Sequence, residues 1–147
     1  MLRWARGRAF DADLSGQVSK LVLGDLAFTF TNWQTPSFDI WEEENGLHYY
    51  TLCVSAAALQ DGAAWLAAVG EINLANAYRV EARKIYRALD GYWLADAGYY
   101  RSRVLASGAR STKELDIAVI LAAIHALGEG TLHTVRDPKV QATLTRL

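Results

Sequence analysis

Residues 35–46 read Thr-Pro-Ser-Phe-Asp-Ile-Trp-Glu-Glu-Glu-Asn-Gly, the part of the chain richest in reactive side chains. Four carboxylates lie within six consecutive positions and have aromatic neighbours: Asp39, Glu42, Glu43 and Glu44, with Phe38 and Trp41. Glycoside hydrolysis needs a carboxylic acid that stays protonated, and nearby negative charge and apolar surface both disfavour ionisation. A solvated helix N-terminus, where acidic residues complement the helix dipole, is the commoner explanation on composition alone.

Helical patterns lie on both sides of this stretch. Before it, apolar residues recur at helical spacing over 18–33, and Pro36 ends that helix. After it, a second helix covers 47–58 and ends near Asp61 and Gly62, with a short helical turn over 64–69. A third long helix covers 72–89. The acidic stretch is therefore expected in a connection between helices, where a scaffold can present side chains.

The second half of the chain is also largely helical. Residues 92–108 lack a helical period and predict a loop with a short hairpin. A capping box of Ser111 and Glu114 predicts a helix over 115–127 that is apolar almost all round and stops at Gly128. Asp137 and Pro138 begin a last helix that runs to residue 147. Because a helix without a polar face must be covered on every side, we expect an all-α fold within a larger helical assembly.

Composition argues against several classes of function. The formal charge of −1 and the pI of about 6.3 do not suit a nucleic-acid or membrane partner, since both need a concentrated positive field. The longest apolar run, 117–124, is too short to span a bilayer, and the first fifteen residues lack the apolar core of a signal peptide. Cys53 is expected to be a small buried side chain. The histidines share no metal-ligand spacing, so no metal is expected: His48, His125 and His133.

The acidic stretch resembles the glucoamylases, the glucan 1,4-alpha-glucosidases. In that family a Thr, Ser or Asn and a Gly or Pro precede Asp-x-Trp-Glu-Glu, and a Gly or Ser follows. This chain fills those positions with Thr35, Pro36, Asp39, Trp41, Glu42, Glu43 and Gly46. Other family positions keep their order along the chain: Asp25, Leu26, Trp33, Tyr50, Thr51, Ala58, Leu59, Gly62, Ala63, Tyr92, Trp93, Lys113, Asp116, Ile124 and His125. The resemblance covers roughly 18–147.

The resemblance implies a fold and a chemistry. The fold would be part of an (α/α)6 toroid, and the reaction would be the inverting release of glucose from the non-reducing ends of starch-like alpha-1,4-glucans. Glu42 would be the general acid and Asp39 its supporting carboxylate, while Glu43 and Trp41 would contact the sugar. No cofactor is implied, the ligands would be starch and maltooligosaccharides, and the location would be extracellular. We expect 1–147 to form a single partial catalytic domain, with 1–14 unrelated to it or disordered.

The resemblance also implies an incomplete site. The family's general base is a glutamate far downstream, and this chain has no matching segment, so we expect an internal fragment that is oligomeric or is completed by the remainder of a toroid. Two alternatives stay open: a truncated, non-catalytic sugar-binding paralogue, and a helical scaffold whose acidic loop only caps a helix. At finer detail, Lys113 and Asp116 are expected to pair at helical i, i+3 spacing. His125 is expected to be buried with a partner.

Overall fold

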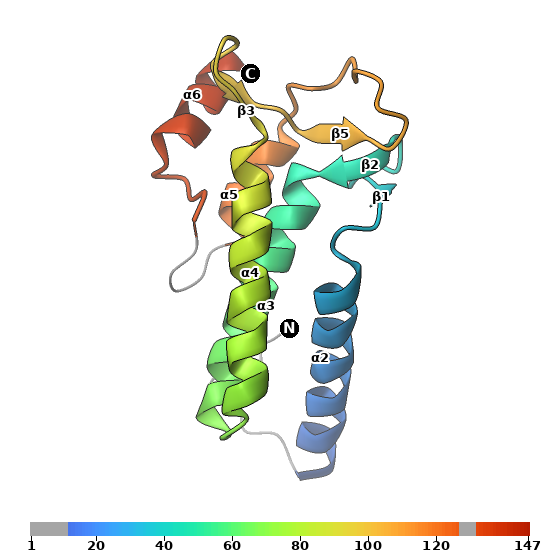
Figure 1. Cartoon of the computed structure of the whole chain (residues 1–147), viewed down its shortest axis with the longest axis vertical. Coiled ribbons are helices and arrows are strands. Elements are labelled where there is room, and N and C mark those ends of the chain that lie inside the picture. Colours follow the sequence, from blue (N-terminus) through green and yellow to red (C-terminus); the bar gives the residue numbers. More distant parts are fainter. Residues whose placement is uncertain (1–11, 127–131) are drawn as a thin grey trace.

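The computed structural model describes residues 12–126 and 132–147, with the backbone alone for 12–15. The predictions for residues 1–11, for the helix end at Leu127 and for the stop at Gly128 lie outside these ranges. Helices dominate the fold: α2 (Ala12–Asn32), α3 (Tyr49–Ala68), α4 (Ile72–Asp90), α5 (Ala118–His125) and α6 (Pro138–Arg146). Figure 1 shows α2, α3 and α4 running along the length of the molecule, with α5, α6 and the strands at one end.

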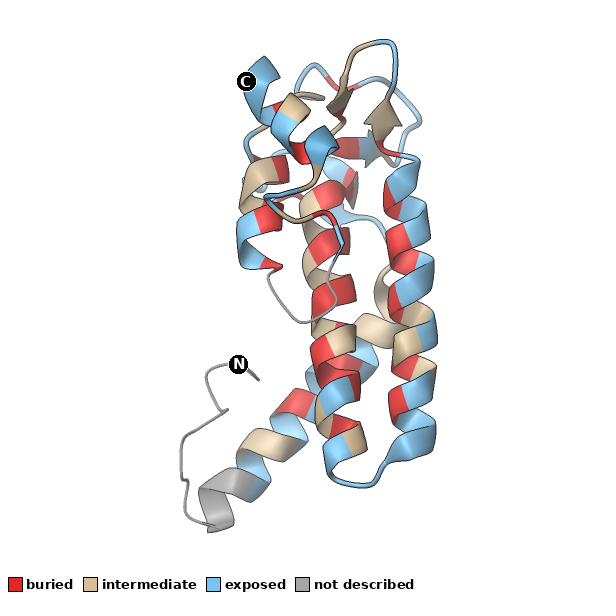
Figure 2. Ribbon diagram, turned by 90° about the vertical axis from the view of Figure 1, so that its left-hand side faces the viewer, coloured by how far each residue is buried: buried red, intermediate tan, exposed pale blue. Residues whose placement is uncertain are grey.

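Helix α3 is the centre of the core. It packs against α2, α4 and α5, and its leucines at seven-residue spacing, Leu52, Leu59 and Leu66, are at most 2% exposed. Buried positions follow α3 along almost its whole length, whereas α4 has a buried face and an exposed one (Figure 2). This difference follows from position: α3 has neighbours on several sides, while α4 has water on one side.

The second predicted helix does not end at Asp61 and Gly62. Helix α3 continues through both residues to Ala68, so the predicted separate turn over 64–69 belongs to the same helix. A Cβ atom at Gly62 would lie 2.6 Å from Leu26 Cδ1. The glycine therefore lets α2 pack closely against α3. Gly62 was predicted to stop the helix, but it serves this close approach instead.

Short strands join the helices at one end. β1 (Ser37–Phe38), β2 (Asn45–His48) and β5 (Arg103–Leu105) form an antiparallel sheet in the order β1-β2-β5. β3 (Trp93–Leu94) and β4 (Tyr99–Tyr100) form the hairpin that was predicted within 92–108. The pairing of β2 with β5 was not predicted. It places the acidic stretch beside a segment about sixty residues further along the chain, with Gly46 opposite Leu105.

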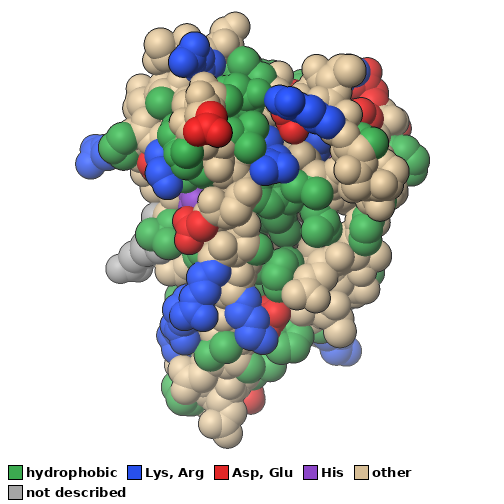
Figure 3. Space-filling view, turned by 45° about the horizontal axis from the view of Figure 1, so that its top comes forward, with side chains coloured by type: hydrophobic (Ala, Val, Ile, Leu, Met, Phe, Trp, Pro, Cys, Tyr) green, Lys and Arg blue, Asp and Glu red, His purple; other side chains and the backbone are tan. Residues whose placement is uncertain are grey.

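Helix α5 is shorter than predicted and is capped differently. It begins at Ala118, whose amide donates to Asp116 Oδ1 at 2.8 Å, so the capping box of Ser111 and Glu114 is wrong. Its small residues face the core, but Ile117 and Ile124 are 44% and 46% exposed. Within the described residues, α5 is thus not covered on every side. Figure 3 shows apolar side chains exposed between charged ones on the face of the molecule that it draws.

Three smaller predictions have clear outcomes. Asp137 caps α6 by accepting a hydrogen bond from the Lys139 amide at 2.8 Å, as predicted. Cys53 is buried, also as predicted, and burial raises the pKa of its thiol to about 12. His125 is exposed, contrary to prediction, and its Nδ1 lies 2.9 Å from the Tyr50 hydroxyl. No helix within 12–126 and 132–147 is long and apolar enough to cross a membrane.

Candidate active site

The acidic stretch forms a tight turn between β1 and β2. The Asp39 amide donates to the Glu44 carbonyl at 3.2 Å, and the Glu42 amide donates to the Asp39 carbonyl at 3.0 Å. The Asp39 carboxylate faces into the turn, where its Oδ1 accepts from the amides of Trp41 at 3.1 Å and Glu43 at 2.9 Å. Asp39 therefore fixes the backbone of Glu42 itself and of both its neighbours.

Glu42 has an unusual backbone conformation. Its φ of 59° lies in the left-handed region, which costs an L-residue with a side chain roughly 1–2 kcal/mol. Its side chain is exposed, and it makes no hydrogen bond or ion pair with the described part of the chain. Strained backbone held by its surroundings is common where a side chain must be presented to a ligand. Here the result is a carboxyl that points into solvent from a rigid turn.

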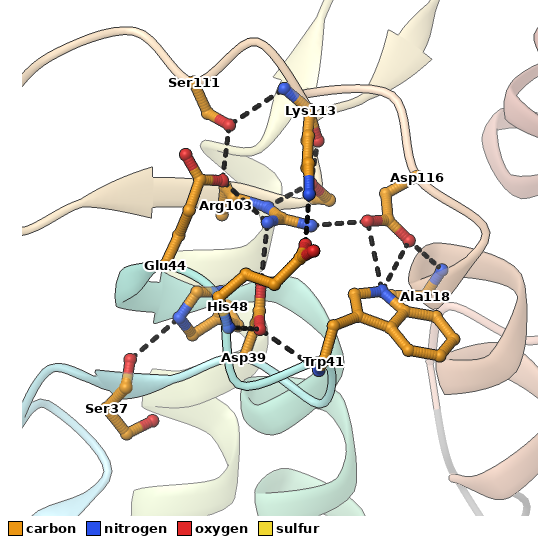
Figure 4. Close-up of polar contacts among 12 residues, drawn as sticks. Ser37, Asp39, Trp41, Glu44, His48, Arg103, Ser111, Lys113, Asp116 and Ala118 are labelled. Carbon is orange, nitrogen blue, oxygen red and sulfur yellow. Dashed lines mark hydrogen bonds and ion pairs between the residues drawn. The ribbon is translucent and has the colours of Figure 1, made fainter.

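Arg103, on β5, lies at the centre of the site. Its side chain is 1% exposed, and each guanidinium nitrogen has a partner (Figure 4). Nη1 donates to Asp39 Oδ2 at 2.6 Å and to Glu44 Oε2 at 2.7 Å, Nη2 donates to Asp116 Oδ2, and Nε donates to Ser102 Oγ at 2.9 Å. One buried cation therefore joins two carboxylates of the acidic turn, Asp39 and Glu44, to Asp116, which lies more than seventy residues further along the chain.

These contacts favour the ionised forms of two carboxylates. Burial opposes ionisation of Asp39, but the Glu43 and Trp41 amides and the Arg103 guanidinium outweigh it and hold the pKa of Asp39 below its usual value. For Glu44, the Ser111 hydroxyl at 2.7 Å lowers the pKa most, burial opposes it, and Arg103 lowers it further. Asp39 and Glu44 are thus fixed anions at neutral pH.

The predicted sugar contacts lie at the rim of the turn. Trp41 is 46% exposed, and its indole Nε1 donates to the Asp116 carboxylate, 3.2 Å from Oδ2 and 3.3 Å from Oδ1. Glu43 pairs with Lys113, and about half of each side chain is exposed. The predicted pair of Lys113 with Asp116 is wrong, because residues 113–116 precede α5 and are not helical. Both residues bind the acidic turn instead.

The acidic stretch is not a helix cap. α3 begins at Tyr49 after His48, no acidic residue lies in its first turn, and β2 separates it from the carboxylates. His48 is buried, and its Nε2 lies 2.9 Å from the Ser37 carbonyl oxygen, which ties β2 to β1. The scaffold interpretation, in which the carboxylates serve only the helix dipole, therefore loses its structural basis.

The sequence analysis assigned roles in the site to four residues and missed Arg103. The four are Asp39, Trp41, Glu42 and Glu43. A single arginine in a non-helical stretch gives no sign of being buried. The alternation of Arg101, Ser102 and Arg103 was the available signal, because side chains two apart share one face of a strand. Without the pairing of β2 with β5, that signal does not say which partner the strand has.

No group of three or more His, Cys, Asp or Glu suited to a metal ion occurs in the described ranges.

Comparison with known proteins identifies the family of this chain. A family model described as Glycosyl hydrolases family 15 matches residues 5–145. The chain belongs to this family. The chain is similar to a glucoamylase of Blastobotrys adeninivorans, 31% identical over 140 residues that cover 94% of this chain and 22% of the relative. A probable glucoamylase of Schizosaccharomyces pombe is 35% identical over 129 residues, covering 85% of this chain and 27% of the relative.

The solved structure of a glucoamylase shares the fold. The structure of glucoamylase from Saccharomycopsis fibuligera superposes with a TM-score of 0.74 at 21% identity, covering 84% of this chain and 27% of the other. The predicted fold class is therefore confirmed: the chain is all-α and forms part of an (α/α)6 toroid. It spans roughly a quarter of the length of the curated relatives that it matches.

Proposed function

We propose that this chain carries the acid-bearing part of a glycoside hydrolase that releases glucose from the non-reducing ends of starch-like alpha-1,4-glucans with inversion. The observation that carries the proposal is Glu42, an exposed carboxyl on a backbone that Asp39 fixes, in a chain whose relatives are named glucoamylases. Starch and maltooligosaccharides are the proposed ligands, no cofactor takes part, and the proposed site of action is extracellular.

Each residue of the turn has a proposed role. Glu42 donates a proton to the glycosidic oxygen as the bond to the leaving sugar breaks. Asp39 stays ionised and keeps the turn in shape. The exposed ring of Trp41 offers a flat apolar surface to a sugar ring. Glu43 exchanges its pairing with Lys113 for hydrogen bonds to sugar hydroxyls, an exchange that costs little because exposed ion pairs are weak.

The general base is proposed to come from outside these residues. An inverting displacement needs two carboxyls about 6.5–9.5 Å apart, on opposite faces of the sugar with water between them. Asp39, Glu43 and Glu44 share one turn with Glu42, and the carboxylates of Asp39, Glu44 and Asp116 are all bound to Arg103, so we propose that none of these acts as the base. The remainder of a toroid, or a second chain, would supply the base.

The test is a titration of the ¹⁵N-labelled chain with maltotriose, followed by NMR. We expect saturable shifts in the Trp41 indole signal and in the amide signals of Glu42 and Glu43. Glu43→Gln should weaken binding at least about threefold, whereas Glu71→Gln, an exposed change at the start of α4, should not. Shifts scattered over the whole chain, or none at tens of millimolar sugar, would reject the proposed sugar site.

A further inference from the structure

We propose that Arg103 is a positioning residue, which sets the direction of the Glu42 carboxyl by holding the acidic turn from two sides. The inference rests on the proposed function, since it matters for catalysis only if Glu42 is the acid. It concerns a residue on β5 whose hydrogen bonds and ion pairs go to residues other than Glu42 and which acts through Asp39 and Asp116.

The first route runs through the backbone. Arg103 Nη1 fixes Asp39 Oδ2 at 2.6 Å, and the other oxygen of the same carboxylate accepts the Trp41 and Glu43 amides. A carboxylate held at both oxygens cannot rotate without breaking a charge-assisted bond. The peptide groups on either side of Glu42 therefore take their orientation from a guanidinium on another strand.

The second route runs through a side chain. Arg103 Nη2 binds Asp116, which also accepts from the Trp41 indole and from the Ala118 amide at the start of α5. Asp116 is thereby anchored to a helix and to a buried cation. The Trp41 ring is linked to the Arg103 guanidinium through Asp116, and the backbone of the turn is linked to the same guanidinium through Asp39. Both the side-chain route and the backbone route therefore depend on Arg103 (Figure 4).

The charge balance makes the arginine hard to replace. Asp39, Glu44 and Asp116 all pair with a guanidinium whose side chain is 1% exposed. Without it, three carboxylates would lie near one another and lose the cation that all three bind, and like charges repel strongly when shielded from water. A lysine would restore the charge but not the planar fork that reaches partners in several directions.

The experiment uses the ¹⁵N-labelled chain and four proteins: wild type, Arg103→Lys, Arg103→Met and the control Arg110→Met. Arg110 is an exposed arginine in the connection between β5 and α5, and it pairs with Glu114. The Trp41 indole signal and the Trp41 and Glu43 amide signals are followed from pH 7 to pH 3. His48 and Glu44 also lie near Asp39, so the titration is followed at the two amides that Asp39 itself binds.

In the wild type we expect the two amides to titrate below pH 3.8. Arg103→Met should raise that midpoint by about one pH unit or more, because a neighbouring cation lowers a carboxyl pKa by about that much. Arg103→Lys should keep the chain folded but shift the Trp41 indole signal, and Arg110→Met should change neither. If Arg103→Met does not fold, Arg103→Lys decides. Wild-type indole and amide signals in Arg103→Lys would overturn the proposal, as would an unchanged midpoint in a folded Arg103→Met.

Maltotriose is then added to separate this inference from the proposed function. Altered turn signals in the Arg103 variants, with maltotriose binding in the wild type that weakens at least about threefold in Arg103→Lys, support both. Altered turn signals without any binding by the wild type reject the proposed sugar site and leave Arg103 as a residue that only shapes the turn. Binding by the wild type that Arg103→Lys leaves unchanged rejects the positioning role alone.

Discussion

Glu42 is the residue on which hydrolysis should depend most directly. In a preparation that contains this chain and hydrolyses maltotriose, Glu42→Gln should lower the rate at least about a hundredfold, since a positioned proton donor is typically worth that much. The amide has almost the same shape as the acid, so sugar binding should persist. Glucose release is the measurement, with Glu71→Gln as the matched control. A Glu42→Gln rate within threefold of wild type would remove Glu42 from the mechanism.

Single titratable groups also predict how stability depends on pH. His133 is buried, and burial lowers the pKa of its imidazole from 6.5. The unfolded chain then binds the extra proton first, so stability should fall as the pH drops below 6.5. Asp39 and Glu44 have lowered folded pKa values, so their contribution is complete above their unfolded values of 3.8 and 4.5 and is lost at lower pH.

Urea unfolding between pH 8 and pH 3 checks this prediction. We expect two successive losses of unfolding free energy, the second of which becomes smaller in Asp39→Asn. His133→Phe should reduce the first loss and leave the second. A flat profile between pH 6.5 and pH 5 would contradict the assignment to His133.

Among the helices and strands, two glycines should respond in opposite directions to substitution by alanine: one change should lower the free energy of unfolding and the other should raise it. A Cβ on Gly46 in β2 would lie 2.4 Å from the Val104 carbonyl oxygen, so Gly46→Ala must push β2 from β5 and should cost about 1–3 kcal/mol. Gly24 lies in α2 with nothing within 4 Å of such an atom, so Gly24→Ala should stabilise by about 0.5–1 kcal/mol. Urea unfolding midpoints measure both. A Gly46→Ala midpoint equal to wild type would mean that the pairing of β2 with β5 is loose.

The sequence predicted the elements with internal periodicity and missed those that depend on distant partners. The long helices and the cap at Asp137 are local features, so spacing and residue type were enough to find them. The pairing of β2 with β5 involves three residues of each strand, too few to show a pattern of their own. Asp116 illustrates the consequence: assigned to Lys113 by helical spacing, it binds Arg103 and Trp41 across the fold.

Many large apolar side chains are exposed within the described residues. Large apolar side chains at least 44% exposed occur on α2, α4, α5 and α6, among other places; examples are Leu21, Phe28, Ile72, Val80, Ile124 and Leu144. Exposed apolar patches of this kind favour association. We therefore expect the chain on its own to associate or to be partly molten.

Light scattering and the binding of an apolar dye measure that prediction. Phe28→Ser combined with Ile124→Lys should reduce both association and dye binding without changing the helix content. A wild-type chain that is a monodisperse monomer, binds no dye and unfolds in one sharp transition would show that the exposed side chains have no such effect.

The left-handed backbone at Glu42 implies a conflict between the stability of the fold and the function of this residue. Glycine adopts that conformation without penalty, so Glu42→Gly should release the strain and stabilise the chain by roughly 1 kcal/mol. The same change removes the proposed acid. Selection for stability alone would therefore replace this glutamate, and only selection for what its carboxyl does would retain it. A Glu42→Gly chain that unfolds at lower urea concentration than wild type would remove the conflict.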